Sequence, residues 1–371
     1  MIELLGIEEK TYTLNLGPQH PSTHGVLRVV LEMDGEFIIK AEPVIGYGHR
    51  GHEHMAENRN YTQFLPNLGR VDYLHALAYN QCYCMAVEKL LDLKVPERAE
   101  FIRVMTNELN RITSHLLWFG AYLMDLGAFT PFLYCFDDRE HILDLLDRVT
   151  GSRLTYCYYR FGGVPTDIDD DFVAGCRAFV SRLRSRWDDY HNLVTKNVIF
   201  IHRTRDVGII TRDQCVKYGI TGPNLRGSGI PYDIRKSEPY SAYPLFDFEI
   251  PIGSNGDIYD RYVVRLAEME QSLRIIEQAC NQLPDGPIMA EKVPKRIKPP
   301  VGEVYQAVET ARGEFGMYIV SQGDVKPYRI KLRTPSFANM SFFPEMAQDN
   351  LVADLVANLG SIDVVIPEID R

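Results

Sequence analysis

Several motifs that would place a cofactor on this 371-residue chain are missing from its sequence. The seven cysteines never form a C-x-x-C pair, and Cys82 and Cys84 stand closest together, so we expect no iron–sulfur cluster on this chain. A Walker-type loop is absent, as is a G-x-G-x-x-G motif after a predicted strand, which disfavours a nucleotide site.

The sequence also has little that would direct it to a membrane or to nucleic acid. Residues 116–133 form the longest apolar stretch, but Gly120, Asp125 and Gly127 interrupt it. Residues 1–10 lack the basic start and apolar core of a secretory signal. The net charge of −10 disfavours a free nucleic-acid binder, so we expect no nucleic-acid partner. We expect reduced thiols in a cytoplasmic compartment, and membrane association only through partner proteins.

The composition, with 45% hydrophobic and 24% charged residues, is typical of a folded protein. The residue patterns indicate that it is mainly helical. The first 45 residues have strand character, and Asp34-Gly35 predicts a hairpin turn between 26–33 and 36–41. Apolar spacing predicts helices, whereas a segment rich in Gly, Pro, Ser and Tyr predicts a long ordered loop. The expected helices are 71–93, 97–125, 138–150, 169–196, 258–283 and 346–359; the loop is 221–257; later strands are 303–308, 317–320 and 328–333.

Two segments near the N-terminus are rich in histidine. Prolines and glycines surround His20 and His24 in the turn 17–25, and such imidazoles suit proton donation, although they could merely satisfy buried backbone groups. Residues 49–57 contain three histidines and two glutamates, which suggests a metal-dependent enzyme. Their order matches neither H-E-x-x-H nor H-x-x-E-H, so we favour a solvated or interface-facing cluster and expect no metal.

Two further candidates lie at helix ends. Tyr73 follows Arg70 in R-V-D-Y, and a phenol beside an arginine can donate a hydrogen bond to a ligand carbonyl. With 21 tyrosines in the chain, simple packing is the alternative. Asp125 stands among apolar residues, where a carboxylate is costly unless it is paired. A histidine partner would create a proton relay, and a buried helix cap is the competing explanation.

Many short segments, spread along nearly the whole chain, resemble the large quinone-site subunit of complex I. That family shares its fold with the large subunit of [NiFe]-hydrogenases, but this chain lacks the thiolates that hold nickel and iron, so hydrogenase activity is unsupported. The similar segments are 17–28, 46–51, 70–73, 108–111, 114–117, 125–128, 161–163, 225–229, 232–236 and 309–313.

The resemblance implies an α+β, mainly α fold, in which a hydrogenase-like central helical bundle carries small β segments at both ends. We expect an N-terminal β-hairpin region at 1–45, a helical core at 46–283 that includes the loop 221–257, and an α+β region at 284–371. These three regions are expected to form one cooperative domain.

The resemblance also implies a quinone cavity shared with a small partner that carries a [4Fe–4S] cluster. His24 and Tyr73 would bind the headgroup of a menaquinone, plastoquinone or ubiquinone and supply protons, and Asp125 would pair with His24. This local change of charge would bias the coupling to proton pumping. His20, His49, Arg50, Arg70 and Thr155 would lie in the quinone site or near the partner's cluster.

Two positions depart from the family pattern. His54 stands where many relatives have lysine, which could add pH sensitivity near the cluster or the interface. Thr155 stands where many relatives have a histidine near the cluster, and this predicts a lower and less pH-dependent cluster potential. Arg50 matches an arginine whose charge would raise that potential.

The expected partners are B-like, C-like and membrane H-like subunits, and the expected location is the cytoplasmic face of the inner membrane or its matrix or stromal equivalent. The electron donor, whether NADH, ferredoxin or reduced F420, is left open by the sequence. An inert scaffold subunit and a metalloenzyme built on His49 to Glu57 are the alternative functions.

Overall fold

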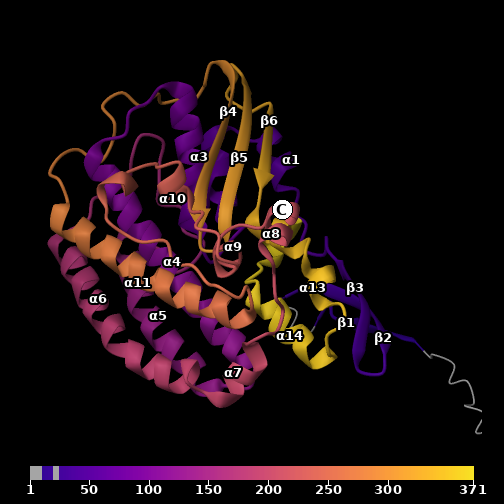
Figure 1. The fold of residues 1–371 in the computed structure, drawn as a ribbon. Coiled ribbons are helices and arrows are strands. Elements are labelled where there is room, and N and C mark those ends of the chain that lie inside the picture. The colour runs from indigo at the N-terminus through magenta and orange to yellow at the C-terminus, as the bar shows by residue number, and fades with distance from the viewer. Residues whose placement is uncertain (1–10, 20–24) are drawn as a thin grey trace, which may run out of the picture.

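The computed structural model describes residues 11–19 and 25–371, and four long helices form its centre (Figure 1). Helix α4 (Glu97–Asp125) packs against α5 (Phe129–Thr150) and α11 (Ile258–Gln282), while α6 (Asp170–Tyr190) packs against α5 and α11. Most of α4 is buried, including polar side chains in its middle. The bundle therefore encloses both an apolar core and a set of charged groups.

Two antiparallel three-stranded sheets lie outside the bundle. The first has the order β1 (Tyr12–Leu16), β2 (Arg28–Asp34) and β3 (Phe37–Val44), with Leu31 opposite Ala41. The second has the order β4 (Val301–Thr310), β5 (Gly313–Gln322) and β6 (Arg329–Arg333). Alternating side chains of β2 are buried, so only one face of the N-terminal sheet packs on the core.

Short helices connect these parts of the molecule. Helix α3 (Ala76–Leu91) lies against β4 and β5, and α1 contacts β6. The remaining short elements are α1 (His52–Asn58), α2 (Tyr61–Leu68), a π turn (His191–Thr195), α7 (Val198–Thr204), α8 (Arg212–Tyr218), α9 (Pro223–Gly227), α10 (Ile234–Ser237), η3 (Tyr243–Leu245), α12 (Pro335–Met340), α13 (Phe343–Ala347), α14 (Val352–Ser361) and α15 (Ile366–Asp370).

The N-terminal sheet packs with the C-terminal helices in a separate apolar cluster, and β3 lies beside α13 (Figure 1). Backbone hydrogen bonds join these distant segments, from Ile38 N to Asn350 O at 2.9 Å and from Val352 N to Glu36 O at 3.1 Å. Both ends of the described chain are thereby brought to one side of the bundle. Among the described residues, no helix has both the length and the apolar character needed to cross a bilayer.

The predicted mainly α class with β segments near both ends is confirmed. The hairpin turn at Asp34-Gly35, the later strands and the helices 97–125, 169–196 and 258–283 are found within a few residues of the expected bounds. The expected loop 221–257 is wrong in part, because it contains α9, α10 and η3.

Three predicted helix bounds are also wrong. The helix expected from residue 71 begins at Ala76, because the Asp72 carboxylate accepts the backbone N–H groups of Leu74 and His75 in a turn. The helix expected at 138–150 begins at Phe129, since Pro131 is tolerated in a first turn. The expected helix 346–359 is broken around Asp349, whose φ is +62°.

Candidate functional site

A pocket of about 380 Å³ lies where three distant parts of the chain meet. The turn before α3 contributes Tyr73, α4 contributes Trp118, and the segment between α14 and α15 contributes Asp363. Most of the other lining groups are apolar, so a bound ligand could form side-chain hydrogen bonds at only a few places in this lining. The complete lining is Gly25, Tyr73, Leu74, Leu117, Trp118, Ala121, Asp363, Val364 and Val365.

The Asp72 carboxylate holds Tyr73 in the pocket. One oxygen accepts hydrogen bonds from Leu74 N at 3.0 Å and His75 N at 3.2 Å, and the other accepts from Arg312 Nη1 at 2.7 Å. Burial raises the pKa of the Tyr73 phenol. The phenol therefore stays protonated at neutral pH and can donate a hydrogen bond to a ligand.

Trp118 forms a fixed wall of the same pocket. Its indole Nε1 donates to Gly360 O at 2.7 Å, and the Arg265 guanidinium lies 4.3 Å from the ring centre. Both contacts restrict rotation of the indole, because a hydrogen bond fixes its edge and a cation–π contact covers a face. Tyr122 also stacks on the indole, with the ring centres 5.3 Å apart, so Trp118 is a rigidly held part of the pocket wall.

Only part of the predicted catalytic trio is described by the structure. Tyr73 lines the pocket, and half-buried Asp125 ends α4, one helical turn after the lining residue Ala121 and on the same helix face. His20 and His24 lie outside the described residues, and Gly25, which follows His24 in the sequence, lines the pocket. The predicted pairing of His24 with Asp125 stays a prediction.

The loop that carries His49 and Arg50 is tied to the C-terminal helix α15. The Asp370 carboxylate accepts hydrogen bonds from Gly46 N at 2.7 Å and Gly48 N at 2.6 Å, and His49 Nδ1 is hydrogen-bonded to Asp370 O at 2.7 Å. Arg50 is exposed at the end of this loop. The loop is therefore held firmly while its cation faces outward.

The carboxylates near His49 bind cations of the protein. Glu53 lies 3.0 Å from Lys331 Nζ, and Glu57 accepts from Arg329 Nη1 at 2.6 Å. Burial, assisted by Arg50, lowers the pKa of His52 to about 4. In the described ranges, 11–19 and 25–371, no three His, Cys, Asp or Glu side chains are grouped to hold a metal ion. The donor arrangement thus gives the metalloenzyme alternative no geometric support.

Arg70 and Thr155 belong to neighbouring segments. The exposed Arg70 donates from Nη1 to Pro66 O, and a Cβ on Gly69 would lie 3.1 Å from Tyr156 O. Thr155 has a φ of +52°, a left-handed conformation that is costly for a β-branched residue. Thr155 therefore presents a small hydroxyl side chain beside the loop that carries Arg70, and the Thr155 backbone is strained.

The sequence interpretation missed four charged residues beneath the pocket, which we call the pocket-floor cluster: Asp72, Arg312, Asp363 and Glu368. All four are buried. Asp72 and Arg312 lie inside segments that resemble the complex I family, so their position was a usable signal. Asp363 and Glu368 lie near the C-terminus, and only the tertiary contacts indicate that they matter.

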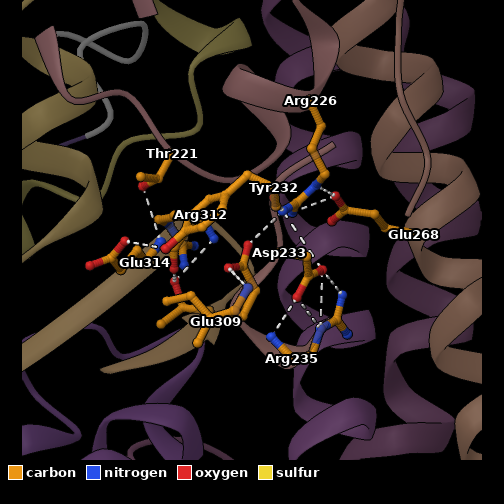
Figure 2. A network of polar contacts seen from close by, with 12 residues as sticks. Thr221, Arg226, Tyr232, Asp233, Arg235, Glu268, Glu309, Arg312 and Glu314 are labelled. Atoms are coloured by element: carbon orange, nitrogen blue, oxygen red, sulfur yellow. Dashed lines mark hydrogen bonds and ion pairs between the residues drawn. The ribbon is translucent and has the colours of Figure 1, made fainter. Parts of the chain in front are cut away.

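A second set of buried charges, the core network, joins α4, α9, α10, α11 and β4, and part of it is drawn in Figure 2. Arg235 binds both Asp233 and Glu108, and Arg226 binds both Glu268 and Glu309. Figure 2 shows Arg226 and Arg235 converging with three of the carboxylates from separate elements, namely Asp233, Glu268 and Glu309. The full network is Glu108, Arg111, Arg226, Asp233, Arg235, Glu268 and Glu309.

Comparison with known proteins identifies the family of the chain. Residues 125–299 and 291–371 match the family described as "Respiratory-chain NADH dehydrogenase, 49 Kd subunit". The chain is 64% identical over 368 residues to the D-type NADH-quinone oxidoreductase subunit of Syntrophobacter fumaroxidans, with 99% of each chain covered. It is 61% identical over 363 residues to the corresponding subunit of Desulfotalea psychrophila, with 98% of each covered.

A more distant relative extends the same likeness. The corresponding subunit of Bacillus mycoides is 48% identical over 365 residues, which cover 98% of this chain and 100% of that protein. Identity of this level over almost the entire length includes the bundle, both sheets and the pocket. The chain therefore belongs to the family of the 49 Kd subunit of the respiratory-chain NADH dehydrogenase, and it is a component of an oxidoreductase complex of that kind.

Proposed function

We propose that the pocket binds a quinone headgroup and that this chain forms the quinone-reduction site of a complex I-type enzyme. The supporting observation is the half-buried, protonated Tyr73 phenol in a pocket that the rigidly held Trp118 also lines. The relatives are named NADH-quinone oxidoreductase subunits, which agrees with a quinone substrate. Menaquinone, plastoquinone and ubiquinone all present the same two ring carbonyls.

The proposed reaction adds two electrons and two protons to the quinone, so that both ring carbonyls become hydroxyl groups. A [4Fe–4S] cluster on a B-like partner supplies the electrons one at a time. Tyr73 donates one proton as negative charge develops on the nearer oxygen, and His24 donates the other. Water returns a proton to Tyr73, and Asp125 in its protonated form passes its proton to His24 and is reprotonated from water, so that the change of charge is transmitted to proton translocation.

The proposed assembly also contains a C-like subunit and a membrane H-like subunit. These partners would hold the chain at the cytoplasmic face of the inner membrane, or at its matrix or stromal equivalent, where the quinone can enter from the bilayer. The donor to the complex can be NADH, reduced ferredoxin or reduced F420, because the donor reacts with other subunits. Purification of the native complex followed by identification of its subunits tests this composition.

The side facing the partner's cluster includes Arg50, Arg70 and Thr155 in this proposal, with His20 and His49 nearby. The exposed Arg50 raises the cluster potential through its charge, whereas Thr155 cannot titrate as a histidine would. We expect a low cluster potential with little pH dependence. A redox titration with a steep slope across the histidine range would contradict this role of Thr155.

The Tyr73→Phe variant in the assembled complex tests the proposed function. Because a general acid contributes about 10²–10⁴-fold, quinone reduction should fall by roughly 100-fold. Electron transfer from the native donor to a water-soluble acceptor that does not need the pocket should be unchanged. Unchanged quinone turnover would favour an inert scaffold subunit instead.

Tyr83→Phe is the matched control for this substitution. The Tyr83 hydroxyl is also buried, and it donates to Tyr61 O at 3.0 Å, outside the pocket lining. This variant removes a buried phenolic hydroxyl without changing the headgroup site. It should retain quinone reduction, and an equal loss in both variants would indicate a structural effect of tyrosine removal.

A further inference from the structure

The floor of the pocket contains more carboxyl groups than cations. Asp363 lines the pocket and is 6% exposed, and its Oδ2 has no hydrogen-bond partner among the described residues. Its Oδ1 lies 3.7 Å from Arg312 Nε. Arg312 is fully buried and already donates to Asp72 Oδ2 at 2.7 Å and Ser114 Oγ at 3.0 Å. One guanidinium is thus shared by at least two carboxyl groups.

Glu368 adds a third carboxyl group to this cluster. Its Oε1 accepts from the Tyr79 hydroxyl at 2.6 Å, and its Oε2 accepts from the Ser336 hydroxyl. Ser336 N lies 3.3 Å from Oε1 as a further donor. Among charged groups, Asp72 raises and Arg312 lowers the pKa of Glu368, so the cation that favours its ionised form is the one that Asp72 and Asp363 also use.

Among the described residues, Arg312 is the cation that lowers the pKa of Glu368 most. α3 presents Tyr79, α12 presents Ser336, and the turns before α3 and after β4 present Asp72 and Arg312. The His75 ring next to Asp72 is not a source of charge, since burial, followed by Arg111 and Arg312, lowers its pKa well below the usual value. Arg371, which follows Glu368 in the sequence by three residues, has its Nε 3.8 Å from a carboxylate oxygen of Glu53 instead.

A charge count shows that this cluster needs a proton. Arg265 also interacts with Asp363, and if its whole charge is assigned there, Asp72 and Glu368 still share Arg312 alone. Asp72 accepts two backbone N–H groups as well as the guanidinium, whereas Glu368 accepts mainly neutral hydroxyls. Since donors to the ionised form favour ionisation, the proton belongs on Glu368. Burial, followed by Asp72, raises the pKa of Glu368 to about 7, which agrees with this placement.

We propose that Glu368 is a positioning residue whose protonation sets the charge beneath the pocket and thereby gates quinone reduction. While Glu368 holds its proton, Arg312 neutralises Asp72 and the pocket floor has no excess negative charge. When Glu368 loses the proton to water, Arg312 must neutralise two carboxylates, Asp72 and Glu368. The excess negative charge then strengthens proton binding by Tyr73 and Asp363 and disfavours an anionic reduced ring.

This inference rests on the proposed quinone site and predicts a specific pH profile for the assembled complex. In the wild type, kcat for quinone reduction should decline as pH rises through the ionisation of Glu368. In Glu368→Gln the group cannot ionise, so this decline should disappear or move upward by about one pH unit or more, with KM little changed. An alkaline decline at the wild-type pH in Glu368→Gln would overturn the proposal.

Tyr79→Phe provides a milder second variant if Glu368→Gln fails to assemble. It removes a hydrogen bond that favours the ionised carboxyl, so the decline should persist but begin at higher pH. Asp138→Asn is the matched control, because Asp138 is a fully buried carboxyl in α5 outside the pocket lining and binds Tyr190 and Arg182. An upward shift in this control too would overturn the gate, since loosening of the fold would then explain it.

Tyr73→Phe measured in parallel separates the two proposals. Loss of turnover in Tyr73→Phe together with an unmoved decline in Glu368→Gln removes only the gate. Normal quinone turnover in Tyr73→Phe removes the proposed quinone site, and a gate that acts on that site falls with it. A moved decline in Glu368→Gln and a large loss in Tyr73→Phe support both.

Discussion

The core network and the pocket-floor cluster contain the same kinds of side chain, yet burial affects their carboxyl groups differently. Burial opposes ionisation in both, but Arg111 and Arg235 lower the pKa of Glu108, and Arg226 lowers that of Glu268 to about 2. In the pocket floor, burial outweighs Arg312 and raises the pKa of both Asp72 and Glu368. The direction follows the balance between nearby donors and nearby carboxylates, because Asp72 and Glu368 each have a carboxylate neighbour that raises the pKa.

Glu309 shows that this rule holds within the core network itself. It accepts from Arg226 Nη1 at 2.8 Å and from Ile234 N at 3.4 Å, while Glu108 accepts from two arginines, Ser272 and Tyr243. Burial, together with Asp233 and against Arg226, raises the pKa of Glu309. Glu108, with many donors, is therefore held in its ionised form. Glu309, with few donors, binds a proton more readily than a carboxyl group in water does.

The largest expected effect comes from breaking the core network with Arg226→Met. This change leaves Glu268 and Glu309 without their main cation and should reduce the free energy of unfolding by about 3–5 kcal/mol. Urea denaturation of the full-length chain measures it. Arg148→Met removes exposed ion pairs with Asp169 and Asp171 and should have no measurable effect. Equal stability of both variants would remove the distinction between buried and exposed pairs.

A smaller effect is expected from Arg312→Met in the pocket floor, and it should depend on pH. Without the guanidinium, Asp72 and Glu368 can become neutral by binding protons, which the unfolded chain releases at lower pH. The folded state then binds more protons than the unfolded state, so stability falls as pH rises, by about 3–4 kcal/mol for two such carboxyls. Urea denaturation near pH 6 and near pH 8 tests this expectation. A loss independent of pH would show that these carboxyls stay charged.

The smallest expected effect is that of Glu368→Gln on stability. In the wild type the pKa of Glu368 rises from 4.5 to about 7 on folding, so the folded chain retains a proton that the unfolded chain loses. This contribution to stability is fully present below pH 4.5 and is lost as pH rises through about 7. The variant should lack this slope, which amounts to about 1–3 kcal/mol. Parallel pH profiles of the two proteins would contradict the shifted pKa.

Sequence patterns predicted long elements better than short or irregular ones. Helices α4, α6 and α11 have extended apolar periodicity, and β2 and β3 flank a clear Asp-Gly turn. The start of α3 was wrong because one buried side chain, Asp72, binds two backbone N–H groups and replaces a helical turn. No periodicity reports a hydrogen bond that depends on a partner such as Arg312, which lies 240 residues away.

The candidate site likewise contains residues that the sequence indicated and residues that only the tertiary structure brings in. Motif resemblance named Tyr73 and Asp125, and the structure places the first in a pocket and the second one turn beyond its lining. The same motifs gave no reason to single out Asp363 or Glu368. These two residues become relevant only because the C-terminal segment folds back beneath Tyr73 and α4.

By itself the sequence determined the family, the long helices and the hairpin and named Tyr73 as a candidate, since periodicity, turn residues and motifs are local along the chain. The tertiary structure alone decided which carboxyl groups share Arg312 and which are surrounded by several cations. Electrostatic interaction depends on distance and burial rather than on separation in sequence. For that reason the sequence contains the charged residues, but the folded chain sets their charge.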